Sequence, residues 1–171
     1  MKATLTGILS LELSELAMLQ VRRLRTQLPS NARPIPDTGT HITLMKLSKQ
    51  DRLLLAPDAI EKIEWPEVML EDRIQRVRRE LAPNPQVQGY PREAWFVLIN
   101  ASGQITLREF RALLTQSVGI TLSEQEIQRP FHVSIANLTG NPMASVGDIR
   151  WDDVVEEHEI DEFQEKEGMS G

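Results

Sequence analysis

The chain contains no cysteine, few aromatic residues and only three histidines. Without cysteine it forms no disulfides and has no thiolate chemistry, which suits a reducing compartment. No apolar run approaches the roughly 20 residues that span a bilayer. Glu12 and Glu15 interrupt the leucine-rich start of the chain, which therefore does not read as a signal peptide. We expect a protein of the cytoplasm without membrane partners.

The length and the charge distribution indicate one folded body followed by an acidic tail. The 171 residues, 40% of them hydrophobic, are enough for one domain or one pair of closely packed lobes. Residues 152–171 hold nine acidic residues and one lysine, which leaves 18 basic and 16 acidic residues in residues 1–151. A mildly basic body fits an anionic substrate, but it lacks the dense basic clusters typical of proteins that bind long duplexes.

Two of the three histidines begin the same four-residue motif, which is called a phrase below. His41–Leu44 and His132–Ile135 both read histidine, apolar, hydroxyl, apolar. In an extended strand, side chains alternate between faces, so each imidazole shares a face with its own hydroxyl, Thr43 or Ser134. Two such strands beside one cleft would place two imidazoles and two hydroxyls around a small site. That set of groups can move a proton on and off a phosphoester without a metal.

The order of predicted elements repeats around these phrases and indicates an α+β fold. Each half has a strand, a helix that follows it and then a histidine strand, so a pseudo-twofold arrangement would bring the two histidine strands together at the centre. Proline breaks residues 48–66, and residues 68–81 fit either a helix or a hairpin that turns at Glu71–Asp72; we favour the hairpin. The other expected elements are strands 3–13, 41–47, 94–100 and 131–138, and helices 14–28 and 104–118. The apolar stripes expected on the two helices include Leu16, Leu19, Ile105 and Leu113.

The two phrases resemble the paired H-x-[ST]-x tetrads of the 2H phosphoesterase superfamily, in which x is apolar. The resemblance covers the tetrads, their spacing and the repeated order of elements. It implies a LigT-like fold of two pseudo-symmetric lobes of antiparallel strands with outer helices, as a single bilobal catalytic domain over residues 1–151. The phrase Phe131–Pro142 looks closest to the phage enzymes that destroy the cyclic-oligonucleotide signals of CBASS defence. Met45–Ser48 stands where the LigT-like group usually has a Phe-Leu-Gly type turn.

The resemblance implies a metal-independent, cofactor-free phosphodiesterase that cleaves 3′-5′ linkages of cyclic di- and trinucleotides, in the host cytoplasm if a phage encodes it. With unperturbed pKa values near 6.5, one imidazole would be the neutral base and the other the protonated acid near neutral pH. Thr43 and Ser134 would donate hydrogen bonds to phosphate oxygens. Which of His41 and His132 is the acid stays open. Three alternatives remain: an enzyme for RNA ends with 2′,3′-cyclic phosphate or 2′-5′ linkages, a non-catalytic nucleotide sponge, and two structural histidines.

Three aromatic residues are candidates for stacking on a nucleobase. Tyr90, in a loop rich in proline and glycine, is the best of them. Trp95 lies on a strongly apolar strand, where a place in the core is favoured. Trp151 would either line the site or cap the second lobe. Lys46 and Asn137 are out of phase with the histidines by strict alternation, so we expect both to lie on the opposite face.

Two clusters of charged residues fit solvated surface better than a site. One is the basic group Arg73, Arg76, Arg78 and Arg79, which could contact phosphates. The other is Glu156–Glu159, which contains His158. It lacks the spacing of known metal motifs and is interpreted as part of the acidic tail, so no metal site is expected.

Overall fold

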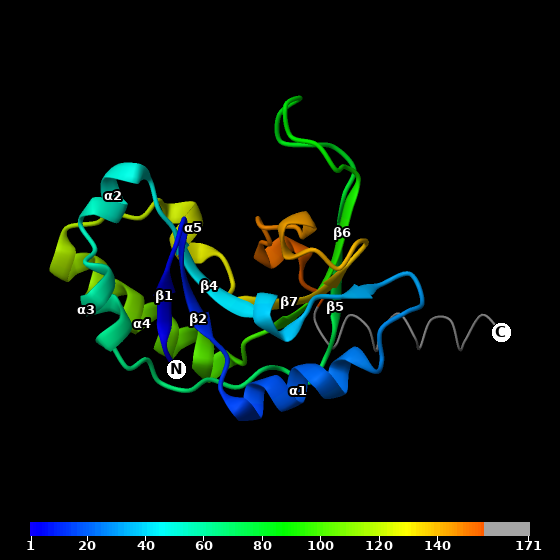
Figure 1. Ribbon diagram of the computed structural model, residues 1–171, viewed down its shortest axis with the longest axis horizontal. Helices are drawn as coiled ribbons and strands as arrows, with labels where there is room; N and C mark the ends of the chain where they lie inside the picture. The colour runs from blue at the N-terminus through cyan, green and yellow to red at the C-terminus, as the bar shows by residue number, and fades with distance from the viewer. Residues whose placement is uncertain (156–171) are drawn as a thin grey trace.

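This computed structural model describes residues 1–155, which form seven strands, five α-helices and three 3-10 turns (Figure 1). The strands are β1 (Ala3–Leu5), β2 (Ile8–Glu12), β3 (Arg33–Pro34), β4 (His41–Lys46), β5 (Gln75–Arg79), β6 (Arg92–Leu98) and β7 (His132–Asn137). The α-helices are α1 (Glu15–Arg25), α2 (Lys49–Leu53), α3 (Pro57–Lys62), α4 (Ala101–Val118) and α5 (Glu124–Gln128). Three 3-10 turns complete the fold: η1 (Asp37–Gly39), η2 (Pro142–Ala144) and η3 (Trp151–Asp153). The predicted α+β class is confirmed.

All seven strands belong to one antiparallel sheet with a symmetric order. Its main path runs β1-β2-β4-β7-β6-β5, and β3 pairs with the far end of β7. The two histidine strands, β4 and β7, are therefore neighbours at the centre, and each is flanked on its outer side by a two-stranded hairpin. The prediction that the histidine strands meet at the centre of the fold is confirmed.

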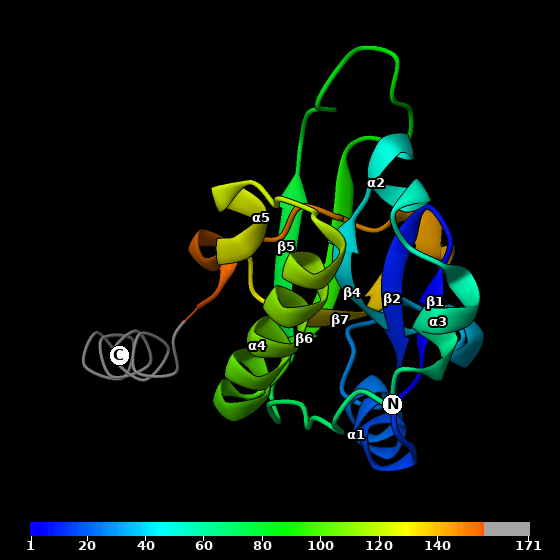
Figure 2. The same ribbon diagram turned by 90° about the vertical axis from the view of Figure 1, so that its left-hand side faces the viewer.

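One face of the sheet is covered by helices and holds the main core. The sheet is strongly bent, and α1, α3 and α4 lie outside the bend (Figures 1 and 2). The apolar residues of both tetrads face these helices and are buried: Ile42, Leu44, Val133 and Ile135. Because side chains alternate along a strand, the histidines and hydroxyls of the tetrads point to the inner face.

The inner face is covered over only one half of the sheet. Over β5 and β6, the side chains of Phe96 and Leu98 form a second apolar cluster with Val146 and Ile149 from the C-terminal segment. Asp153 of this segment is held by Arg79 of β5 at 2.7 Å. The inner face over β1 and β2 has no such covering cluster among residues 1–155, so this half stays open toward the histidines.

The same irregularity occurs at the fourth position of both tetrads. The register between β2 and β4 passes from Thr43 to Met45 and skips Leu44. The register between β6 and β7 passes from Ser134 to Ala136 and skips Ile135. Each skip is a β-bulge, which adds one residue to a strand and shifts the later side chains to the other face. The two halves therefore share a local distortion as well as the order of their elements.

The bulges correct the prediction for Lys46 and Asn137, which strict alternation places opposite the histidines. After Leu44, Met45 is also buried in the main core, so Lys46 returns to the face of His41. Asn137 returns in the same way on β7, where its side chain bonds the backbone of Asn141 and the hydroxyl of Ser145. Sequence periodicity fails here because one inserted residue reverses the phase.

Two predicted segments differ from the structure. The single strand over residues 3–13 is the hairpin of β1 and β2, with its turn at residues 6 and 7. The hairpin at Glu71–Asp72 is wrong: only residues 75–79 form a strand, and it pairs with β6. Ser14 caps α1 by accepting the backbone N–H of Ala17, and Gly119 ends α4 with a φ of 79°.

Gln104 of α4 fixes the residue that precedes His132. Its buried amide donates to the carbonyl of Phe131 at 2.7 Å and accepts the N–H of Phe131 at 2.8 Å. Gln104→Leu keeps the size of the side chain but leaves the buried N–H of Phe131 without a partner. We therefore expect the free energy of unfolding to fall by about 2 kcal/mol. Urea denaturation measures the loss. Gln116→Leu, at an exposed position of the same helix, is the matched control, and equal losses in both variants would contradict this role.

Candidate functional site

The four polar side chains of the tetrads form a compact group on the inner face. Ile42 pairs with Val133 across the antiparallel strands β4 and β7. In that register, His41 lies opposite Ser134, and Thr43 lies opposite His132. Each histidine therefore faces the hydroxyl of the other tetrad, and the two imidazoles occupy diagonal corners, where backbones are about 7–8 Å apart. All four side chains are half-buried, so they remain accessible to a ligand.

The His41 imidazole is oriented by the carbonyl of Gly39. Its Nδ1 lies 3.2 Å from that oxygen, and because a carbonyl only accepts, Nδ1 carries the proton and Nε2 has a free lone pair. Burial lowers the pKa of His41 below 6.5, although the Gly39 carbonyl opposes this. A side chain at Gly39 would collide with Pro142, so glycine allows η1 and η2 to meet beside the imidazole.

The His132 imidazole is held in the same way but in more apolar surroundings. It bonds the carbonyl of Pro130, two residues upstream, and meets the ring of Phe96 edge-on at 5.6 Å. Burial lowers the pKa of His132 to about 4, with smaller contributions from the charges of His41 and Lys46. Burial thus favours the neutral form of both imidazoles in the free protein, and it does so more strongly at His132.

The neighbouring strands explain why the two imidazoles differ. On β2, Glu12 pairs with His41 and Ser10 pairs with Thr43, so this side of the group is polar. On β6, Leu98 pairs with His132 and Phe96 pairs with Ser134, so that side is apolar. An apolar setting disfavours the charged imidazolium, and the larger lowering of the pKa therefore falls on His132.

Two surface hollows adjoin the group, one at each end. The first is beside His41, and its other lining residues include Ser10, Glu12, Met18, Arg22 and Asp37. The second is beside His132 and Thr43, and its other lining residues include Lys46, Arg111, Glu126, Arg129 and Gly147. A ligand bound at the four tetrad side chains can therefore extend in two directions.

The structure brings one of the three aromatic candidates near the second hollow. Trp95 is 3% exposed in the main core, on the face opposite the histidines, which confirms the favoured core position and excludes stacking on a ligand there. Tyr90 lines neither hollow, and the Arg92 guanidinium lies over its ring at 4.8 Å. Trp151 is 42% exposed and lines a groove that shares Arg129 with the hollow beside His132. Of the three, Trp151 keeps its candidate role.

The basic cluster of β5 is occupied by partners within the protein. Arg76 bonds Glu93, Arg78 bonds Glu80, and Arg79 bonds Asp153. Arg73, which precedes the strand, donates to the carbonyl of Val155. These arginines hold the hairpin and the C-terminal segment together, as expected for surface residues, and add no free cation beside the histidines.

Two further predictions concern metal and membrane binding. Glu156–Glu159, with His158, lies outside the described residues. Within residues 1–155, no group of three or more histidine, aspartate or glutamate side chains is arranged to hold a metal ion. Within the same residues, no helix combines the length and the apolarity needed to cross a bilayer.

Comparisons with known proteins identify no relative of this chain. No protein-family model matches the chain, and no significant match to a curated protein or to a solved structure was found. The chemistry of the site therefore has to be inferred from the tetrads, their shared face and the two hollows.

Proposed function

We propose that the protein is a phosphodiesterase of the 2H type, in which His41 and His132 are the acid–base pair and no metal takes part. The main support is that both tetrads lie on adjacent central strands with their four polar side chains on one accessible face. The symmetric sheet, with one hairpin outside each histidine strand and the same bulge in both tetrads, supports the two-lobed 2H fold.

The different surroundings of the imidazoles support an assignment of roles. His132, with its pKa near 4, is the neutral base that removes the proton of a ribose 2′-OH. The 2′ oxygen then bonds to phosphorus, and the bond from phosphorus to the 5′ oxygen breaks. His41, protonated when the anionic diester binds, gives its proton to that leaving 5′ oxygen. The products are a 2′,3′-cyclic phosphate and a free 5′-OH.

The hydroxyls of Thr43 and Ser134 complete the site. Each lies on the same face as the imidazoles and opposite the histidine of the other strand. They donate hydrogen bonds to the non-bridging phosphate oxygens, where charge grows in the transition state. For the substrate we propose the 3′-5′ linkages of cyclic di- and trinucleotides, which the resemblance of Phe131–Pro142 favours.

A panel of three nucleotides in EDTA tests this function. Incubation with 3′,3′-cyclic dinucleotides and cyclic trinucleotides should give linear products that end in 2′,3′-cyclic phosphate, as chromatography and mass spectrometry would show. Opening of a 2′,3′-cyclic mononucleotide alone would instead indicate an enzyme for RNA ends. Tight binding without products would indicate a sponge. Activity lost in EDTA and restored by a divalent ion would contradict the proposed mechanism.

A further inference from the structure

The hollow beside His132 is lined by three cationic side chains and one carboxylate. The cations are Lys46, Arg111 and Arg129, and the carboxylate is Glu126. Both oxygens of Glu126 are already engaged: one bonds Arg129 at 3.3 Å, and the other accepts the backbone N–H of Lys46 at 3.2 Å. The hollow therefore has a surplus of positive charge immediately next to the histidines.

Lys46 has no acidic partner for its ammonium among residues 1–155. The bulge at Leu44 brings this lysine to the inner face, and its Nζ lies against Gly147, where a Cβ would be 3.6 Å away. That distance is an ordinary van der Waals contact, so the ammonium lies directly beside Gly147. Lys46 is exposed, so its charge is available to a ligand.

Arg111 is the more unusual cation because it is buried without a paired carboxylate. The residue is 4% exposed, and its guanidinium donates to the carbonyls of Leu44 at 2.8 Å and Ile127 at 3.2 Å. It also lies over the ring of Phe131 at 4.9 Å. Glu126 adds a favourable charge interaction without a direct bond, and Arg108 adds an unfavourable one, so burial of this charge stays costly and lowers the pKa of Arg111. An anion in the hollow would offset this cost.

The hollow beside His41 is different in charge. Its Arg22 is engaged by Asp37, which Arg25 also bonds, and Glu12 adds a negative charge next to His41. An anion is therefore favoured only at the His132 end of the group.

We propose that the hollow formed by Lys46, Arg111 and Arg129 binds a second phosphate of the substrate, next to the phosphate that reacts between the histidines. This inference rests on the proposed function and narrows its substrate class to molecules with at least two phosphates. A substrate with two or more phosphates, such as a cyclic dinucleotide, fills both places. A 2′,3′-cyclic mononucleotide has one phosphate and leaves the hollow empty. The structure thus favours oligonucleotide substrates over single nucleotides.

Binding measurements with one lysine variant test the second phosphate site. Turnover is blocked with His41→Ala, and Kd is measured by isothermal titration for 3′,3′-cyclic di-AMP and for 2′,3′-cyclic AMP. Adding Lys46→Ala should raise the Kd of the dinucleotide about tenfold, as expected for the loss of a charge-assisted contact. The Kd of the mononucleotide should rise less than twofold. The loss should shrink as salt rises.

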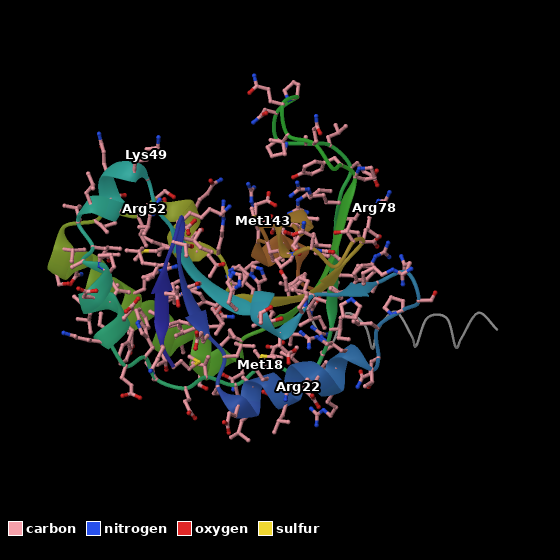
Figure 3. The ribbon with its side chains drawn as sticks, in the orientation of Figure 1. Met18, Arg22, Lys49, Arg52, Arg78 and Met143 are labelled. Atoms are coloured by element: carbon pink, nitrogen blue, oxygen red, sulfur yellow. The ribbon has the colours of Figure 1, made fainter. Side chains whose placement is uncertain are left out.

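Lys49→Ala is the matched control because it removes the same charge three positions along the chain. Lys49 and Arg52 extend from α2, on the side of the molecule away from Arg78 and β5 (Figure 3), and Lys49 lines neither hollow beside the histidines. Neither Kd should change by more than a factor of about two.

The possible outcomes separate this site from the proposed function. Equal weakening of both ligands by Lys46→Ala, or no weakening of either, would overturn the second phosphate site even if the protein cleaves dinucleotides. Selective weakening in a protein whose wild type cleaves nothing would support the site and contradict the phosphodiesterase. A protein that binds neither ligand would contradict both.

Discussion

His41→Ala and His132→Ala are each expected to lower kcat for cyclic-dinucleotide cleavage by about 10²- to 10⁴-fold, the range typical of a lost general acid or base. His132→Ala removes the base that deprotonates the 2′-OH, and His41→Ala removes the acid that protonates the leaving oxygen. Both side chains are half-buried on the open face of the sheet, and each has one backbone partner, so the fold should tolerate their loss.

The double variant tests whether the two imidazoles act as one unit. The effects of substituting residues that share one proton-transfer mechanism are strongly non-additive. The kcat of His41→Ala/His132→Ala should therefore be only slightly lower than that of the less active single variant. Thermal unfolding of each variant shows whether it is folded. Turnover within a few-fold of wild type in either folded single variant would exclude the proposed acid–base pair.

The site and the centre of the sheet were predictable because the tetrads are strongly periodic. In each tetrad the apolar residues are fully buried and the polar residues half-buried, as alternation requires. Strand alternation also places an imidazole and a hydroxyl on one face without knowledge of the partner strand. The meeting of the tetrads followed from the repeated order of strand, helix and histidine strand.

The cationic hollow was not predictable because its members come from unrelated positions. Lys46 reaches it through a bulge, which no period-2 pattern contains. Arg111 reaches it from α4, whose buried face includes Gln104, Arg111 and Thr115, while Ile105 and Leu113 are 59% and 65% exposed. Thr115 bonds the carbonyl of Ala112 in the same helix, but Gln104 and Arg111 find their partners on Phe131 and Leu44, which the helix's own sequence does not reveal.

The first helix shows the same limit of apolar patterns. Leu16 and Leu19 were expected on its buried stripe, yet they are 59% and 56% exposed. The buried residues are Ala17, Val21 and Leu24, which are spaced three to four positions apart and therefore share one face of α1. By contrast, Trp95 lies in the core, as its strongly apolar strand favoured.

The pH dependence of kcat/KM follows from the pKa values of the free protein, and its maximum is expected between about pH 4 and pH 6.5. The base must be neutral, so activity is lost as the pH falls through the pKa of His132, near 4. The acid must be protonated, so activity is lost as the pH rises through the pKa of His41, which lies below 6.5. Between pH 6.5 and 8.5, kcat/KM should fall roughly a hundredfold, because the protonated fraction drops about tenfold per pH unit.

The same profile can distinguish the two histidines through Lys46, whose charge lowers the pKa of His132. Lys46→Ala should therefore move the acid limb of kcat/KM to higher pH and leave the alkaline limb, which belongs to His41, in place. Lys49→Ala should move neither limb. A shift of the alkaline limb alone would contradict the assignment of the lower pKa to His132. An alkaline limb above pH 8 in the wild type would contradict the lowered pKa of both imidazoles, because a group that must be protonated would then titrate well above 6.5.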